Sequence, residues 1–127
     1  VPVAAAVTDA EGAVIALAQN RMRRDGSALH HAEILVLAEA LAQRGSERLE
    51  DCDLWVTLEP CTMCAGAIAH VRIRRLYFAA RDEKAGAVES GVRFFDSPSC
   101  HHRPDIYGGL SEAAAAAQLK AFFEQRR

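Results

Sequence analysis

Four residues in two short segments carry the side chains whose types and spacing could do chemistry. His31 and Glu33 lie in the first segment, and Cys61 and Cys64 lie in the second. One imidazole and two thiolates are three good zinc ligands, whereas a structural zinc site uses four. The fourth position of a three-ligand site is open to a water, and a carboxylate close to the histidine could exchange a proton with that water. The pattern therefore predicts a hydrolytic zinc site.

The elements that carry the two segments must bring them together, and both segments are predicted to lie where a helix begins. Apolar residues repeat with helical spacing over 31–44, and Gly45 follows as a C-cap. Pro60 suits the first position of a second helix, which is expected to run to about Val71. Two helices that enter from the same edge of a sheet can present their first residues to one point.

The two helices are expected to set the positions of these side chains and to shift the pKa of the thiols and of Glu33. The spacing of Cys61 and Cys64 puts both thiols on one helical face, and the positive helix ends should lower the pKa of these thiols. Glu33 borders the apolar face of the first helix, so partial burial should raise its pKa. A raised pKa suits a carboxyl group that takes and then returns a proton.

The remaining elements predict a single α/β domain over residues 1–127, a three-layer α/β/α fold around a central five-stranded mixed sheet. Apolar runs on either side of the turn signal at 9–12 predict an antiparallel hairpin, and the polar stretch 20–29 is expected to be a loop. A last helix should follow the N-cap Ser111. The irregular stretch 81–104 has the length of a functional loop. The expected strands are 3–8, 13–18, 53–58, 75–80 and 105–110.

The composition of the 127 residues is that of a globular protein, with 50% hydrophobic and 25% charged residues. No apolar run reaches the roughly 20 residues that cross a bilayer, and the start lacks the features of a secretory signal, so a cytoplasmic location is expected. The net charge of −2 implies that any nucleic-acid binding depends on local basic clusters, each of which alone is more typical of a solvated surface. These clusters are Arg21, Arg23 and Arg24; Arg72, Arg74 and Arg75; and Arg126-Arg127.

A different class of protein could also use the second segment. Cys61 and Cys64, between a strand and a helix, could form a thioredoxin-like redox pair, but that interpretation leaves the histidine and glutamate of the first segment unexplained. The other cysteines, Cys52 and Cys100, have no partner at ligand spacing and are interpreted as ordinary thiols. Cys100 precedes His101-His102, but adjacent side chains diverge, which disfavours a second metal site there.

The two segments together resemble a known signature. His31-Ala32-Glu33 followed by Pro60-Cys61-Thr62-Met63-Cys64 is similar to the motif of the zinc-dependent nucleoside and nucleobase deaminases. Nearly the whole chain resembles the bacterial tRNA-specific adenosine deaminases. The segments that carry this closer resemblance are 1–3, 20–21, 56–67, 80–86, 102–103, 122–123 and 126–127.

The resemblance implies a cytidine-deaminase-like fold, one Zn²⁺ per chain and hydrolytic deamination of adenosine to inosine at the tRNA wobble position. By that resemblance His31, Cys61 and Cys64 hold the metal, and Glu33 relays protons. The same resemblance makes Asn20 a purine contact, where the alternative is a loop asparagine that tolerates a turn. It also gives the backbone N–H of Ala32 a role in supporting the water or the substrate. The implied partners are a tRNA anticodon stem-loop and a second copy of the chain. Relatives that deaminate free guanine, adenosine or cytidine share the zinc motif, so they remain the alternative.

The chain departs from the family pattern in three places. Ser27-Ala28-Leu29-His30 replaces the usual Asp-Pro-Thr-Ala before the zinc histidine, and His30 is expected to point away from the metal. Ala4 replaces a glycine. Family members also begin with a helix that is not in this sequence, and without it an apolar face of the sheet is expected to be uncovered.

Overall fold

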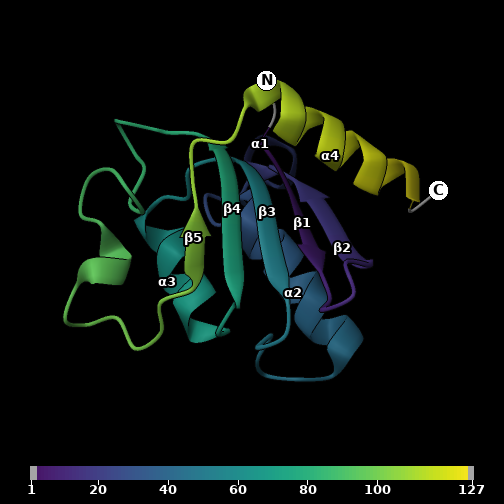
Figure 1. Ribbon diagram of the computed structural model, residues 1–127, viewed down its shortest axis with the longest axis horizontal. Helices are drawn as coiled ribbons and strands as arrows, with labels where there is room; N and C mark the ends of the chain where they lie inside the picture. Colours follow the sequence, from purple (N-terminus) through teal and green to yellow (C-terminus); the bar gives the residue numbers. More distant parts are fainter. Residues whose placement is uncertain (1–2, 126–127) are drawn as a thin grey trace.

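A five-stranded mixed sheet with the strand order β2-β1-β3-β4-β5 forms the centre of the protein (Figure 1). The computed structural model describes residues 3–125, so the resemblance at Val1-Pro2 and the basic pair Arg126-Arg127 lie outside the described residues. β1 pairs antiparallel with β2 and β3, whereas β4 pairs parallel with β3 and β5. The strands are β1 (Ala4–Thr8), β2 (Val14–Gln19), β3 (Asp53–Leu58), β4 (Arg75–Ala80) and β5 (Asp105–Tyr107).

The turn between β1 and β2 forms because Asp9 satisfies the backbone of the residues that follow it. Its carboxylate accepts hydrogen bonds from the N–H groups of Glu11 at 3.0 Å and Ala13 at 2.9 Å. Gly12 has φ 85°, a conformation that glycine adopts without strain. The predicted hairpin is confirmed.

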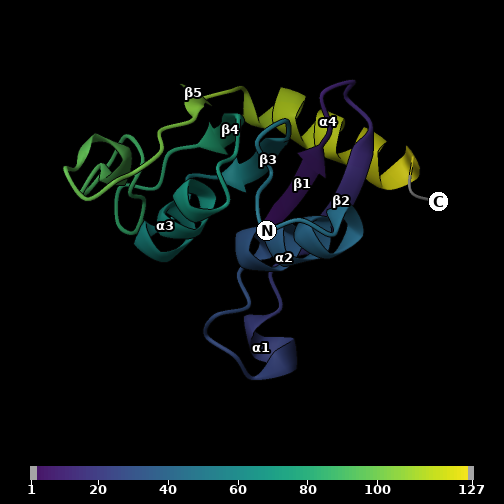
Figure 2. The same ribbon diagram turned by 90° about the horizontal axis from the view of Figure 1, so that it is seen from below.

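Helices cover both faces of the sheet, as Figures 1 and 2 show. α2 (Ala32–Arg44) and α3 (Thr62–His70) lie on one face, and α4 (Glu112–Gln125) lies on the other. Because side chains alternate along a strand, Leu54 joins the core under α2 and α3, while its neighbour Trp55 packs with α4. The predicted three-layer fold is confirmed. Within residues 3–125, no helix is both long and apolar enough to cross a membrane.

Four parts of the chain differ from the sequence-based predictions by more than one residue or by an added short helix. The stretch 20–29 contains one helical turn, α1 (Met22–Asp25), which ends at Gly26 with φ 61°. α3 begins at Thr62 because Cys61 is extended, with φ −77° and ψ 177°, so Pro60 lies outside the helix. The long loop 81–104 contains a short 3₁₀ helix, η1 (Phe94–Asp96).

The last strand is also shorter than predicted, since β5 ends at Tyr107. A side chain at Gly108 would collide with the ring of Phe78, and Gly109 has φ 67°, which a strand residue does not adopt. The two glycines turn the chain away from the sheet toward α4. There the hydroxyl of Ser111 accepts a hydrogen bond from Ala114 N–H at 3.3 Å, as expected of an N-cap.

Candidate metal centre and active site

His31, Cys61 and Cys64 meet at one point, although His31 lies in a different segment from the two cysteines. The Nδ1 atom of His31 lies 3.7 Å from the Cys61 sulfur and 3.6 Å from the Cys64 sulfur. Among the described residues, this is the one group of three or more potential metal ligands, and its ligand atoms all lie within 4.8 Å of one another. The predicted convergence is confirmed.

The two helix starts place these ligands. His31 is the N-cap of α2 and Cys61 is the N-cap of α3, and neither side chain caps its own helix with a hydrogen bond. Both side chains are therefore available to face the shared point, while their carbonyls accept the first helical hydrogen bonds from Leu35 and Ala65. Cys64 lies in the first turn of α3, where its side chain is buried.

The spacing of the three atoms fits a zinc ion. With Zn–S and Zn–N distances of about 2.3 and 2.0 Å, two ligands of a tetrahedral site lie roughly 3.5–3.8 Å apart. The two nitrogen–sulfur separations of 3.7 and 3.6 Å lie in that range. A set of one imidazole and two thiols also matches the ligand preference of zinc, and it leaves one tetrahedral position unfilled by protein.

The surroundings of the Cys64 thiol oppose its ionisation in the absence of a metal ion. Burial raises its pKa strongly, and the neighbouring Glu33 and Cys61 raise it further. The expectation that the helix end would lower the pKa is therefore wrong for Cys64 in the metal-free protein, because the loss of solvation outweighs the helix dipole. A divalent cation reverses this balance by pairing directly with the thiolate.

Glu33 has the environment of a proton carrier. It lies in the first turn of α2 with only 4% of its surface exposed. Burial raises its pKa, while its own backbone N–H, His31 and Cys64 offset part of that rise. The predicted upward shift is confirmed, and a raised pKa suits a carboxyl group that both accepts and releases a proton.

A cavity of about 150 Å³ opens beside these residues. Pockets for whole ligands are typically about 300–1,000 Å³, so this one is sized for a single base-like ring. His31, Glu33 and Cys61 line it together with Asn20. The rest of its wall is Val3, Met22, Leu58, Glu59, Asp82 and Ala85.

Asn20 both stabilises a turn and lines the cavity. Its side-chain oxygen accepts a hydrogen bond from Met22 N–H at 3.0 Å, which is a turn role, and the residue also lines the cavity. Its amide nitrogen carries two further donors. Ala32 is fully buried as the first residue of α2, where a backbone N–H has no partner within the helix.

His30, which replaces a small residue of the family pattern, does not belong to the metal group. Its Nδ1 lies 2.7 Å from the carboxylate of Asp25, which also pairs with Arg21 at 3.1 Å. The hydrogen bond with His30 is the largest influence on Asp25 and holds its pKa below the usual value. The expectation that His30 points elsewhere is confirmed.

The remaining cysteines are placed as ordinary thiols. Cys52 is fully buried, and burial raises its pKa to about 11. The Cys100 thiol lies 3.0 Å from the carbonyl oxygen of His102, whose ring in turn lies 2.7 Å from the carbonyl oxygen of Ile73. Cys52 and Cys100 both lie outside the metal group.

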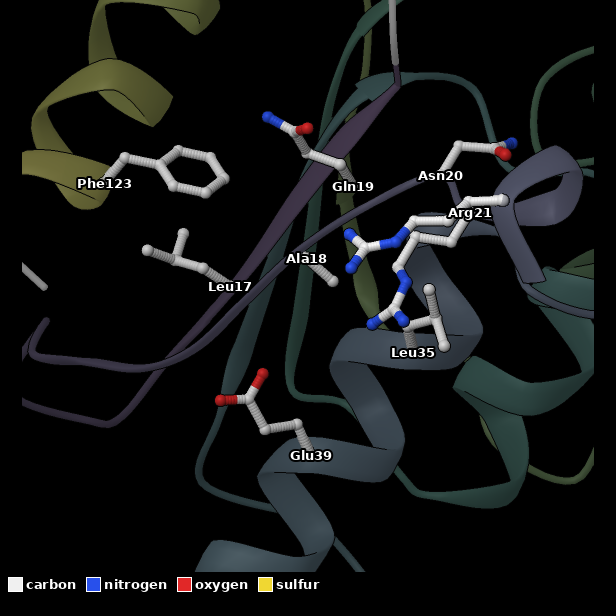
Figure 3. A pocket seen from close by; sticks show the side chains of 9 residues that line it. Leu17, Ala18, Gln19, Asn20, Arg21, Leu35, Glu39 and Phe123 are labelled. Atoms are coloured by element: carbon white, nitrogen blue, oxygen red, sulfur yellow. The ribbon is translucent and has the colours of Figure 1, made fainter.

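A second and larger cavity of about 520 Å³ lies next to the first, and Asn20 borders both. Figure 3 shows Glu39 of α2 and Phe123 of α4 around the same hollow as the guanidinium of Arg21, with the amide of Asn20 directed away. Arg24 also lines it, so two members of the first basic cluster border a cavity that shares Asn20 with the smaller one.

Sequence reasoning missed Glu59, which also lines the smaller cavity and is 3% exposed. Burial raises its pKa, but hydrogen bonds from Ser90, Asp82 and Glu89 more than offset this and lower the pKa overall. The available signal was an acidic residue at the end of a buried strand, directly before Pro60-Cys61.

Comparison with known proteins gives one family. Residues 1–80 match the model of the cytidine and deoxycytidylate deaminase zinc-binding region. The tRNA-specific adenosine deaminase of Agrobacterium fabrum is 55% identical over 122 residues, which are 96% of this chain and 80% of that protein. The protein of the same name from Rickettsia bellii is 46% identical over 128 residues, covering 100% of this chain and 88% of that one.

Solved structures agree. A structure from studies of A-to-I editing by tRNA:A34 deaminases has a TM-score of 0.82 and 55% identity, and it covers 84% of this chain and 82% of that chain. A guanine deaminase from Nitrosomonas europaea has a TM-score of 0.68 and 28% identity, and it covers 94% of this chain and 71% of that chain. The matched region of the family model contains both helix starts that form the metal centre, and the chain belongs to the zinc-binding cytidine and deoxycytidylate deaminase family.

Proposed function

We propose that this protein is a zinc-dependent hydrolase that deaminates adenosine to inosine at the wobble position of a tRNA anticodon. The observation that carries the chemistry is the buried carboxyl of Glu33 beside the His31, Cys61 and Cys64 group, at the wall of a base-sized cavity. The substrate follows from the relatives, since those with 55% and 46% identity are named tRNA-specific adenosine deaminases.

In this proposal His31, Cys61 and Cys64 hold one zinc ion, which would supply an activated water as the nucleophile. Glu33 accepts a proton from the water that attacks C6 of the adenine and delivers it to the ring nitrogen. Glu33 then carries the remaining proton of the added hydroxyl to the amino group on C6. The bond between C6 and this nitrogen breaks, so that water and adenosine become inosine and ammonia. Both transfers need a carboxyl group that is easily protonated, which the burial of Glu33 provides.

The residues around the cavity would orient the base. The amide donors of Asn20 suit the acceptors of a purine edge, and the N–H of Ala32 at the start of α2 would support the water or the substrate. An anticodon-loop base is already unpaired, so its entry into a small pocket costs little unstacking energy.

The anticodon stem-loop would be held by local basic groups, because the net charge of −2 gives no general attraction to RNA. Arg21 and Arg24 border the larger cavity beside Asn20 and are suited to phosphate contacts. By the resemblance to the family we expect a homodimer, and a tRNA substrate implies action in the cytoplasm.

A deaminase of a free base or nucleoside is the second candidate, favoured by the small cavity and by the structural similarity to a guanine deaminase. The test is to incubate the zinc-loaded protein with an anticodon stem-loop RNA and, separately, with guanine, adenosine and cytidine. Inosine found only in the digested RNA supports the proposal. Release of ammonia from a free base or nucleoside, with the RNA unchanged, would overturn it.

A further inference from the structure

We propose that Glu59 is a positioning residue of the substrate pocket. Its buried carboxylate anchors the segment 82–90 at the end of β3 and so fixes the wall that Asp82 and Ala85 contribute. The anchor is independent of which substrate is deaminated, whereas its effect on RNA rests on the proposed function.

The carboxylate of Glu59 accepts five hydrogen bonds, and all of them come from the segment 82–90. One oxygen, Oε1, accepts from the N–H of Asp82 at 3.0 Å and from the hydroxyl of Ser90 at 2.9 Å. The other, Oε2, accepts from the N–H groups of Val88 at 3.0 Å, Glu89 at 2.8 Å and Ser90 at 2.8 Å. Both ends of the segment are therefore tied to one side chain.

Val88 in the interior of the segment is buried, and its N–H donates to the carboxylate of Glu59. A buried N–H without a partner is costly, so the carboxylate stabilises this conformation of the segment. A Cβ atom at Gly86 would lie 2.5 Å from the carboxyl carbon of Glu59, so the backbone approaches the anchor as closely as only glycine allows. The carboxylate of Glu59 and the backbone of the segment are therefore in close contact.

The same segment is joined to the metal centre. Gly86 forms an antiparallel bridge with the ligand Cys61, and Ala87 N–H donates to the carbonyl of Pro60 at 2.9 Å. Asp82 and Ala85 then line the same cavity as His31 and Glu33. The anchor thus sets the distance between the substrate-facing wall and the reacting centre.

Glu59 is a positioning residue rather than a proton carrier, although it lines the same cavity as Glu33. Both of its oxygens are occupied by fixed donors that favour the charged carboxylate. A group that must gain and lose a proton during each turnover cannot keep five such donors satisfied. Its contribution is geometric.

The experiment compares Glu59→Ala and Glu59→Gln with two controls in the full zinc-loaded chain. Ser90→Ala removes the hydroxyl donor but keeps the four backbone donors, and Glu83→Gln removes an exposed charge of the same segment. The readouts are zinc content, amide hydrogen exchange, and kcat and KM for the anticodon stem-loop RNA.

With Glu59→Ala, we expect zinc to stay at about one ion per chain, as the three ligands are intact. The amides of Asp82, Val88, Glu89 and Ser90 should exchange at least about tenfold faster. KM should rise about tenfold while kcat changes less than about threefold. In Glu59→Gln, the amide oxygen can still accept the three hydrogen bonds that Oε2 accepts, but the amide NH₂ group faces the N–H of Asp82, which loses its acceptor. Faster exchange should therefore be confined to Asp82, and the rise in KM should be smaller than in Glu59→Ala.

Unchanged amide exchange in Glu59→Ala would overturn the proposal. Loss of zinc and of kcat without a specific change in KM would also overturn it, because such a combined loss indicates general destabilisation. If Glu59→Ala does not fold, Glu59→Gln decides by the same criteria. If the unaltered chain deaminates guanine and not RNA, the proposed function fails, and the anchor is then judged by exchange and by KM for guanine.

Discussion

Glu33 and Glu59 are two buried carboxyl groups on the wall of one cavity, and their surroundings differ in kind. Glu33 is buried, and the loss of solvation outweighs the effects of its backbone N–H, His31 and Cys64, so its pKa is raised. Glu59 accepts hydrogen bonds from fixed N–H and O–H groups, which lower its pKa in spite of burial. The first environment suits proton transfer and the second suits a permanent charge, so the residue type alone does not assign the role.

Replacement of Glu33 should separate chemistry from metal binding. Glu33→Gln keeps the shape and leaves all three metal ligands, so we expect normal zinc content and a fall in kcat of about 10²–10⁴-fold. The measurement is single-turnover inosine formation in the RNA, with metal analysis of the same sample. Near-normal turnover would remove Glu33 from the mechanism.

The cysteines should differ in reactivity according to their placement. At about pH 8, a thiol with a pKa near 11, such as buried Cys52, is thiolate in only about one part in a thousand and should resist alkylation. Its reactivity should increase only as the pH rises toward that pKa. Cys61 should be protected by zinc and become labelled after chelation, which peptide mass spectrometry can follow. Labelling of Cys61 in the metal-loaded protein, or a disulfide with Cys64, would favour the dithiol redox class.

At the scale of elements, Asn20 stabilises the turn that leads into α1. Its side-chain oxygen accepts a hydrogen bond from Met22 N–H at 3.0 Å, so a loss of activity in an alanine variant does not by itself distinguish this turn role from a base contact. A serine at position 20 can still accept a hydrogen bond from Met22 N–H, but it lacks the two donors of the asparagine amide.

Two substitutions of Asn20 therefore distinguish the turn from the base contact. If the amide contacts the purine, Asn20→Ser and Asn20→Ala should both raise KM, by about five- to thirtyfold for one or two lost hydrogen bonds. Steady-state kinetics on the stem-loop RNA provide the measurement. Near-normal KM in the serine variant together with a raised KM in the alanine variant would assign Asn20 to the turn.

Of the two adjacent phenylalanines of helix α4, only one is buried against the sheet, where it packs in the same cluster as Leu119. Phe122 is 4% exposed and lies edge-on to Trp55, with ring centroids 5.7 Å apart, whereas Phe123 borders the larger cavity. We expect Phe122→Ala to lower the free energy of unfolding by about 3–5 kcal/mol, and Phe123→Ala to lower it by much less. Urea unfolding of the matched pair tests this, and equal losses would contradict the assigned packing.

For the whole molecule, the parts that follow local rules were predictable. The limits of β3 and β4 follow from compact apolar runs, and the limits of α2 follow from helical periodicity and Gly45. The metal group was predictable because its residue types are rare together and each segment lies at a helix start.

Other features depend on tertiary contacts and left no local pattern. β5 ends where Gly108 meets the ring of Phe78, a residue distant in sequence. Glu59 gains its role only when the segment 82–90 folds back over it, and a single glutamate before Pro60 does not reveal that. Local periodicity therefore predicts elements better than it predicts the segments that close a site.

Removal of the metal should affect the molecule as a whole. Zinc binds the folded arrangement of α2 and α3 and so stabilises it by mass action. We expect a chelator to lower Tm by at least about 4 °C and to abolish turnover, with both restored by one equivalent of zinc. Thermal scans with and without chelator test this, and an unchanged Tm would exclude zinc as part of the native protein.

The position of the ligands at the starts of two separate helices has a consequence for maturation. α2 packs on the antiparallel half of the sheet, and α3 follows β3, which joins that half to the parallel strands. We therefore expect the sulfurs and the imidazole to come within reach of each other only after the central strand has docked between its neighbours. In that order of events the ion binds late in biogenesis, to a frame that is already assembled, and completes the protein instead of nucleating it.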